Sequence, residues 1–318
     1  MSESNKRNFI VHGSILAIAG ILVRIIGMLY RIPVVNIIGS EGNGIYGAAF
    51  NIYNIMLVLS SYGLPMAVSK LVSARFTKKR YKSAAKVLRC SLMVAVCTGG
   101  IAALLVFFGA SFIENVIYGG GLPGLAIPLR ILAPTIFLVA ILGVIRGFFQ
   151  GQSTMIPTAV SQILEQIVNA IVSIAAGYGM MKAFASSPDV AAYGAAGSTL
   201  GTAMGALTAV LFMGFLYAVY TPTFNRLKRK DRHTENQSTG QICKIIIYTM
   251  IPIILGQTFY QISALIDDVM FSNIMVGRDI TKSISMDLGN FSSSYSLLIG
   301  IPQGVASAMS ASMLTSVV

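Results

Sequence analysis

Long runs of apolar residues follow one another along most of the chain, separated by short polar or basic segments. A run of about 18 or more such residues is long enough for a helix to cross a bilayer once. The pattern predicts about eight membrane-spanning helices, at 9–30, 46–65, 87–110, 128–150, 156–180, 193–220, 245–271 and 288–314. The runs lack the alternation of outer-membrane strands, so we expect an all-α, polytopic membrane protein.

The overall composition supports the same fold class. Of the 318 residues, 55% are hydrophobic and only 11% are charged. Soluble domains carry about 25% charged residues. The triplet Ala17-Ile18-Ala19 mimics a signal-peptide cleavage site, but the apolar stretch continues well past it, which favours an uncleaved first span.

The positive charges lie in particular segments between the predicted spans. The net charge is +12, and sixteen of the 23 Lys and Arg residues lie in 1–8, in 66–86 with Arg89, and in 221–244. Basic segments of this kind mark the cytoplasmic side, so the N-terminus is predicted to be cytoplasmic. Their expected partners are the anionic headgroups of membrane lipids, and no nucleic acid is expected.

The segment 221–244 is the longest and most polar connection, and it predicts a boundary between two lobes. We expect a six-helix lobe with cytoplasmic basic loops at 1–242. The remaining residues, 243–318, would supply the first two helices of a second lobe. The last residues are still apolar and carry no basic anchor, which predicts a chain truncated from a longer protein.

Two arginines interrupt the first predicted span. Gly20, Arg24, Gly27 and Arg31 are spaced by four, three and four residues, so they form one stripe along a helix. An arginine at the centre of a membrane helix costs about 2.5–3.5 kcal/mol, which favours a functional reason for its presence. Guanidinium is a bidentate partner for phosphate, so we expect a buried anion site at Arg24 and Arg31. The alternative is a structural ion pair between Arg24 and Glu165.

A polar ridge runs along the predicted span 156–180. Gln162, Glu165, Gln166 and Asn169 occur at i, i+3, i+4 and i+7 and therefore share one helix face. Such a face must point into the protein or into a water-filled cavity. We expect Gln162, Glu165 and Gln166 to line the same cavity as the two arginines.

Other intramembrane residues predict structural roles. Gly197, Gly201 and Gly205 have the spacing that lets two membrane helices approach closely. Arg146, at the end of the span 128–150, is expected to be an anchor at the membrane interface. The chain has no GxxxxGK[ST] loop and only two histidines, so neither a nucleotide site nor a metal site is expected. No cofactor and no enzymatic activity are predicted.

Five motifs occur in order along the chain and together resemble a known family. They are Arg24-Ile-Ile-Gly-Met-Leu-Tyr-Arg-Ile-Pro33, Gly44-Ile-Tyr-Gly47, Gly63-Leu-Pro-Met-Ala-Val-Ser-Lys70, Arg146-Gly-Phe-Phe-Gln-Gly151 and Ile156-Pro-Thr-Ala-Val-Ser-Gln-Ile-Leu-Glu-Gln166. The sequence resembles the bacterial polysaccharide-biosynthesis flippases, and among them the stage V sporulation protein B-like group. These belong to the multidrug/oligosaccharidyl-lipid/polysaccharide (MOP) exporter superfamily, together with lipid II flippases of the MviN type.

The resemblance implies a MOP/MATE-like bundle of twelve to fourteen spans in two lobes, around a cavity that opens alternately to each side. It also implies a lipid-linked sugar pyrophosphate as cargo. In lipid II flippases an arginine pair on the first helix serves the cargo, and Arg24 and Arg31 match it at a spacing one residue longer. Those flippases also have an arginine late in the second helix, which 51–61 lacks.

The leading hypothesis is therefore a flippase of the cell membrane for an undecaprenyl-pyrophosphate-linked glycan precursor, such as lipid II or a polysaccharide repeat unit. Its driving force would be the membrane potential or a coupling ion, Na+ or H+. A multidrug (MATE-type) cation antiporter is one alternative. A non-transporting membrane scaffold for wall synthesis or sporulation is another.

Overall fold

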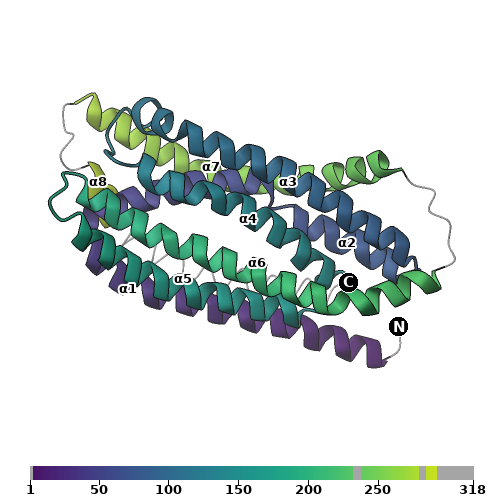
Figure 1. Ribbon diagram of the computed structural model, residues 1–318. Coiled ribbons are helices and arrows are strands. Elements are labelled where there is room, and N and C mark those ends of the chain that lie inside the picture. Colours follow the sequence, from purple (N-terminus) through teal and green to yellow (C-terminus); the bar gives the residue numbers. More distant parts are fainter. Residues whose placement is uncertain (1–2, 232–237, 279–283, 292–318) are drawn as a thin grey trace.

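The computed structural model describes residues 3–231, 238–278 and 284–291, and every regular element in these ranges is a helix. The elements are α1 (Glu3–Ser60), α2 (Leu64–Thr77), α3 (Tyr81–Phe112), the π-helix η1 (Ile113–Ile117), α4 (Ala126–Gln150), α5 (Ile156–Ala183), α6 (Val190–Lys230), α7 (Thr239–Val276) and α8 (Ile284–Phe291). The long helices lie side by side in an elongated bundle (Figure 1). The prediction of an all-α fold is confirmed.

Within the described residues, six helical stretches are long and apolar enough to cross a membrane. They are Ile18–Thr77, Tyr81–Ile117, Ala126–Gln150, Ile156–Ala183, Val190–Lys230 and Thr239–Val276. The first covers both of the first two predicted spans. The eighth predicted span, 288–314, lies mostly outside the described residues. The chain is therefore a multi-pass membrane protein.

The break between the first two predicted spans is a single glycine. Gly39 has φ 70° and ψ 176°, which is not helical, although α1 is continuous on both sides of it. A positive φ of this kind is strained for residues with a Cβ and is readily adopted by glycine. The second half of α1 turns back along the bundle toward α2 (Figure 1). Residues on either side of Gly39 consequently face one another.

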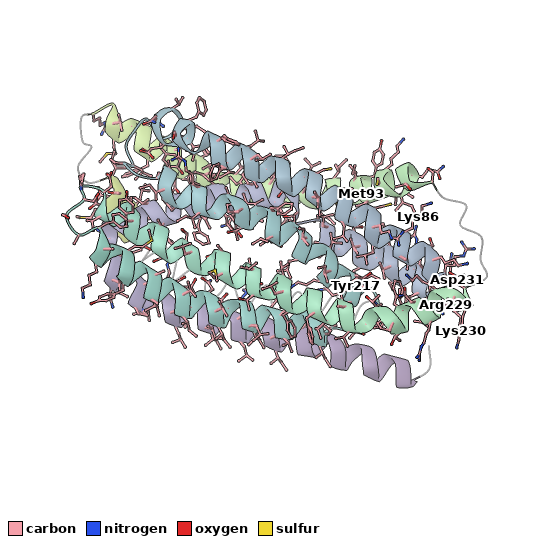
Figure 2. The ribbon with its side chains drawn as sticks, in the orientation of Figure 1. Lys86, Met93, Tyr217, Arg229, Lys230 and Asp231 are labelled. Atoms are coloured by element: carbon pink, nitrogen blue, oxygen red, sulfur yellow. The ribbon has the colours of Figure 1, made fainter. Side chains whose placement is uncertain are left out.

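The basic segments meet at one end of the bundle. Lys86, Arg229, Lys230 and Asp231 lie together there (Figure 2). The Asp231 carboxylate accepts a hydrogen bond of 2.8 Å from the backbone N–H of Lys82, which fixes the end of α6 to the start of α3. We call this the basic end. The α8 helix lies at the opposite end (Figure 1).

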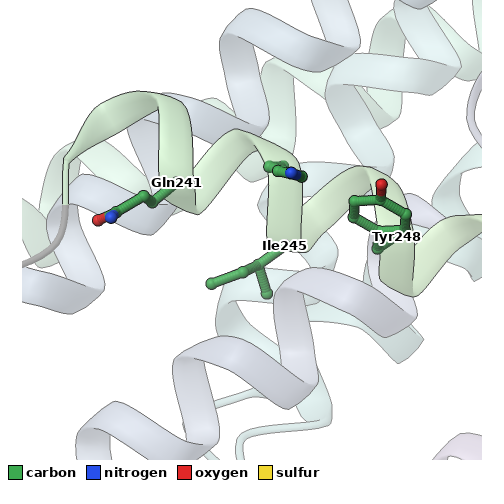
Figure 3. Close-up of a pocket in the computed structure, with 4 residues that line it drawn as sticks. Gln241, Ile245 and Tyr248 are labelled. Atoms are coloured by element: carbon green, nitrogen blue, oxygen red, sulfur yellow. The ribbon is translucent and has the colours of Figure 1, made fainter.

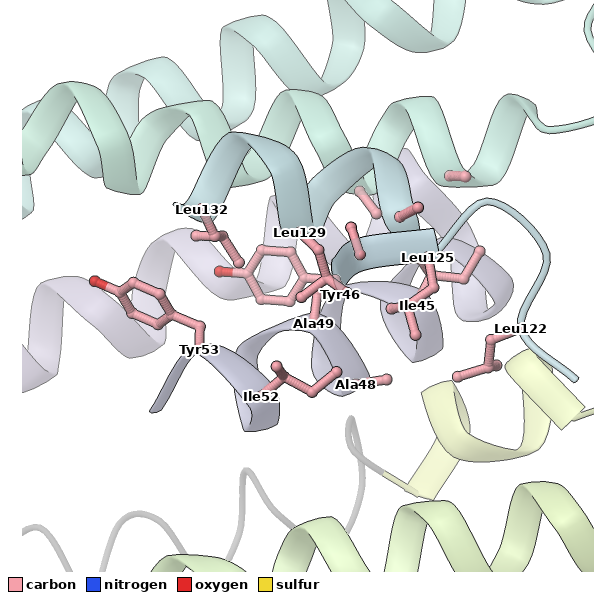
Figure 4. Packing of buried hydrophobic residues seen from close by; sticks show 14 of the residues in the cluster. Ile45, Tyr46, Ala48, Ala49, Ile52, Tyr53, Leu122, Leu125, Leu129 and Leu132 are labelled. Atoms are coloured by element: carbon pink, nitrogen blue, oxygen red, sulfur yellow. The ribbon is translucent and has the colours of Figure 1, made fainter. Parts of the chain in front are cut away.

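Two buried apolar clusters hold the helices together. One joins the second half of α1 to α4 through residues such as Tyr46, Tyr53, Leu125 and Leu129 (Figure 4). The other lies nearer the basic end and joins α2, α3, α4, α6 and the first half of α7. Ile242, Ile246 and Met250 of α7 belong to it. The lobe boundary at 242 remains a prediction.

The glycine spacing in α6 does produce a close helix contact. A Cβ added to Gly205 would lie 2.6 Å from the Glu165 carbonyl oxygen of α5, and one on Gly201 would lie 2.6 Å from that of Asn169. A Cβ on Gly197 would meet the Ala176 backbone. Backbones therefore touch along the α5–α6 seam, which confirms the predicted close packing.

Candidate functional site

The seam between α1 and α5 brings the predicted polar ridge next to the arginine stripe. A Cβ added to Gly27 would lie 3.2 Å from Nε2 of Gln166. One turn further along both helices, Asn169 donates a hydrogen bond of 3.2 Å from Nδ2 to Tyr30 Oη. Both contacts advance by three residues on each helix, so α1 and α5 run in the same direction here.

That register also gives the relative level of two residues one turn earlier on these helices. One turn before Gln166 on α5 is Gln162, and about one turn before Gly27 on α1 is Arg24. Gln162 therefore lies at the level of Arg24. Both glutamines are half-buried. Gln162 and Gln166 thus lie on the α5 side of the seam, at the level of the α1 segment that carries Arg24 and Gly27.

The expectation that Arg24 is buried is wrong, because its side chain is exposed. Helix α5 packs against the Gly27 side of α1, about 60° around the helix from Arg24. Arg24 is left at the border between this packed side and an exposed apolar side, which carries Ile21, Leu22, Ile25 and Leu29. Within the described residues Arg24 has neither a hydrogen bond nor an ion pair.

Arg31 is held by neutral groups from the second half of α1. Its Nη2 donates to Asn43 Oδ1 at 2.9 Å. Its guanidinium carbon lies 4.3 Å from the centroid of the Tyr46 ring. Asn43 in turn donates from Nδ2 to the carbonyl oxygen of Gly289 in α8 at 2.8 Å. Among the described residues Arg31 thus has no carboxylate partner, and its donors are partly occupied.

Glu165 faces α4 and not the arginine stripe. Arg146 Nη2 lies 2.7 Å from Glu165 Oε2, and Arg146 Nε donates to Ser161 Oγ at 2.9 Å. The two charged side chains are 14% and 27% exposed. The predicted role of Arg146 as an interfacial anchor is therefore wrong, because α5 returns alongside the end of α4 and covers it. The alternative ion pair between Arg24 and Glu165 is likewise not formed.

Breaking this ion pair is expected to destabilise the protein. In Glu165→Gln, Arg146 loses its counter-charge while still largely buried, at a cost of about 1–3 kcal/mol. The measurement is the melting temperature of the purified protein in detergent. Glu41→Gln makes the same chemical change at an exposed glutamate and should leave it unchanged. Equal melting temperatures for both variants and the wild type would show that the pair contributes nothing.

The structure also shows polar contacts that the sequence analysis missed. Asn43, which holds Arg31, lies in the polar, glycine-rich stretch 39–44, and that composition was the available signal. Asn51 donates from Nδ2 to Asp268 Oδ2 at 2.6 Å and so links α1 to α7. Neither pairing could be read from spacing along one helix, because each joins two separate segments.

The end of α7 is fixed to the connection between η1 and α4. Ser272 Oγ donates to the Tyr118 carbonyl oxygen at 2.8 Å, and Asn273 Nδ2 donates to the Ile117 carbonyl oxygen at 2.7 Å. Burial raises the pKa of the Tyr118 phenol far above its ordinary value, and the charge of Asp268 raises it further. The phenol is therefore neutral at physiological pH. The end of α7 is thus attached to this connection, opposite the basic end.

A shallow hollow near the basic end is separate from this seam. It is lined by Gln241, Lys244, Ile245 and Tyr248, which all lie on one face of α7 (Figure 3). All four residues are exposed. The Lys244 amine lies 5.6 Å from the centroid of the Tyr248 ring. An amphipathic Lys–Tyr pair of this kind suits the headgroup region of a membrane.

Comparison with known families identifies the chain. Residues 10–314 match the family described as "Polysaccharide biosynthesis protein". The chain belongs to the polysaccharide biosynthesis protein family. Two proteins of Bacillus subtilis (strain 168) are similar to the chain over part of their length. The lipid II flippase MurJ is 34% identical over 176 residues, which are 54% of this chain and 32% of MurJ. Stage V sporulation protein B is 30% identical over 210 residues, which are 65% of this chain and 39% of that protein.

The fold also matches solved transporters. An inward-facing multidrug resistance MATE family transporter of the MOP superfamily superposes with a TM-score of 0.63 at 16% identity, over 92% of this chain and 64% of the transporter. This polysaccharide biosynthesis family member therefore has the MOP fold, as the sequence predicts. Its chain spans well under half the length of MurJ and of stage V sporulation protein B.

Proposed function

We propose that the chain belongs to a flippase for an undecaprenyl-pyrophosphate-linked glycan precursor. The observation that carries the proposal is Arg24, a guanidinium within a membrane-spanning helix that has no partner among the described residues. Membership of the polysaccharide biosynthesis family and the similarity to a lipid II flippase supply the cargo class. The N-terminus and the basic end are cytoplasmic, because basic segments stay on that side. The opposite end is therefore the outer end.

A pyrophosphate needs such a site because an unpaired charge is too costly to move through hydrocarbon. Arg24 supplies the positive charge, and Gln162 and Gln166 supply amide donors along the same seam. Arg31 is the second cation, at the outer end. Glu165 is neutralised by Arg146, so its role is to hold α4 against α5. The mechanism requires no chemical conversion of the cargo.

A second lobe, which begins at 243, would cover the side of α1 that carries Arg24. The matched parts are only 32% and 39% of the lengths of MurJ and stage V sporulation protein B. Two lobes facing one another across Arg24 would form a cavity, and their relative motion would expose it to each side in turn. The membrane potential is worth about 2.3 kcal/mol per charge per 100 mV. That potential, or a coupling ion such as Na+ or H+, is the driving force that we propose.

The test is reconstitution of the full-length chain in proteoliposomes that contain a fluorescent undecaprenyl-pyrophosphate disaccharide. A membrane-impermeant quencher reports the fraction of headgroups on the outer leaflet. We expect headgroups to cross only in vesicles that contain the protein, and faster with an imposed potential. A parallel arm measures uptake of a cationic dye, because the fold is shared with a multidrug transporter. Dye transport without headgroup transport would assign the antiporter function instead. If neither the headgroup nor the dye is transported, the non-transporting scaffold is the hypothesis that is favoured.

A further inference from the structure

At the outer end lies a series of hydrogen bonds that the proposed cargo could break. Arg31 donates to Asn43, and Asn43 donates to the Gly289 carbonyl oxygen. These hydrogen bonds connect the two halves of α1 with each other and with α8. Asn43 itself is fully buried, and Gly289 is buried. Helix α8 belongs to the part that we propose as the second lobe, so these contacts join the two lobes at the outer end.

The backbones of α1 and α8 touch beside these hydrogen bonds. A Cβ added to Gly44 would collide with the Ser285 carbonyl group, and one added to Gly289 would collide with that of Ser40. The absence of side chains on both glycines therefore allows a contact that leaves no room for a lipid headgroup. The outer end is closed at this crossing.

We infer that Asn43 is a positioning residue of an outer gate, and that a bound phosphate opens this gate through Arg31. This inference rests on the proposed function. The present partners of Arg31 are a neutral amide oxygen and an aromatic ring. A phosphate oxygen accepts a stronger, charge-assisted hydrogen bond from guanidinium than an amide oxygen does. Pyrophosphate that reaches Arg31 therefore displaces Asn43.

The displacement weakens the hold of α1 on α8. The contacts of Asn43 include one hydrogen bond accepted from Arg31 and one donated to Gly289. Loss of the first removes a contact that orients the amide group for the second. A ligand shifts a two-state equilibrium only through its difference in affinity for the two states. Here the phosphate binds more tightly to the open state, because Arg31 is more accessible to it when the gate is open.

The test measures access to the α1–α8 contact in the full-length chain. Ser285→Cys is introduced after the native cysteines Cys90, Cys97 and Cys243 are replaced, because Ser285 is buried at the crossing. A membrane-impermeant maleimide is applied from the outer side. We expect Asn43→Ala to raise the labelling rate about tenfold, equivalent to about 1.4 kcal/mol. Asn290→Ala, an exposed asparagine next to Gly289, should leave the rate unchanged. Equal rates in wild type and Asn43→Ala would overturn the gate.

A second arm tests the opening by phosphate. Undecaprenyl pyrophosphate should raise the labelling rate of the wild type at least threefold, whereas uncharged undecaprenol should not. Arg31→Gln should label fast without ligand and should not respond to it, a result that a merely structural role would not give. An equal response in Arg31→Gln would overturn the exchange at Arg31, as would no response in a wild-type chain that flips the lipid. Absence of flipping would instead reject the proposed function, with the effect of Asn43→Ala unaffected.

Discussion

Replacing Gly201 with valine is expected to prevent stable folding of this protein. A Cβ at this position would lie 2.6 Å from the backbone nitrogen of Ser173 and from the Asn169 carbonyl oxygen. Both are backbone atoms of α5, so they cannot move aside as the tip of a side chain can. Overpacking a core costs about 1–3 kcal/mol even where side chains can adjust. Here α5 and α6 must separate, so we expect at least the upper end of that range.

The measurement is the amount of monodisperse protein in detergent and its melting temperature. Gly214→Val is the matched control on the same helix, because a Cβ added to Gly214 has no atom within 4 Å. It should express and melt as the wild type does. Gly201→Ala should be intermediate. Normal yield and melting temperature for Gly201→Val would mean that α5 and α6 do not touch as described.

The helical fold and its close contacts were predictable because they depend on local pattern. Apolar run length predicted the spans that lie within the described residues. The spacing of Gly197, Gly201 and Gly205 predicted a helix contact, which the structure places against α5. The structure places the break in the helix at Gly39, which lies between the first two predicted spans. Such predictions need only the spacing of residues along a single helix, because that spacing decides which residues share a face.

The partners of the charged residues were less predictable. The spacing of Arg24 and Arg31 places them on one side of a helix, yet the two residues differ in environment. Arg31 meets Asn43 because the chain reverses at Gly39, and Glu165 meets Arg146 because α5 returns beside α4. Spacing along one helix does not show that α1 reverses at Gly39 or that α5 packs beside α4. Tertiary packing therefore decides which cation stays free.

Arg24 is the residue whose loss should reduce transport most. Hydrogen bonds to charged groups contribute about 1.5–3 kcal/mol, so Arg24→Ala should slow headgroup transport by about 10- to 150-fold. Arg24→Lys keeps the charge but loses the planar fork that fits phosphate, and should retain part of the rate. Since Arg24 is exposed and has no partner within the described part of the chain, neither change should lower the melting temperature.

Arg130→Ala separates an effect of position from a general effect of positive charge. Arg130 is an exposed arginine on a different span, and its Nη2 donates to Ser111 Oγ at 2.8 Å. Its replacement should leave the transport rate near that of the wild type. If Arg24→Ala transports at the wild-type rate in the same vesicles, Arg24 faces lipid and does not face the cargo. If Arg24→Ala and Arg130→Ala are equally slow, the arginines act through the overall charge of the protein. Only loss at Arg24 alone assigns the cargo phosphate to the seam between α1 and α5.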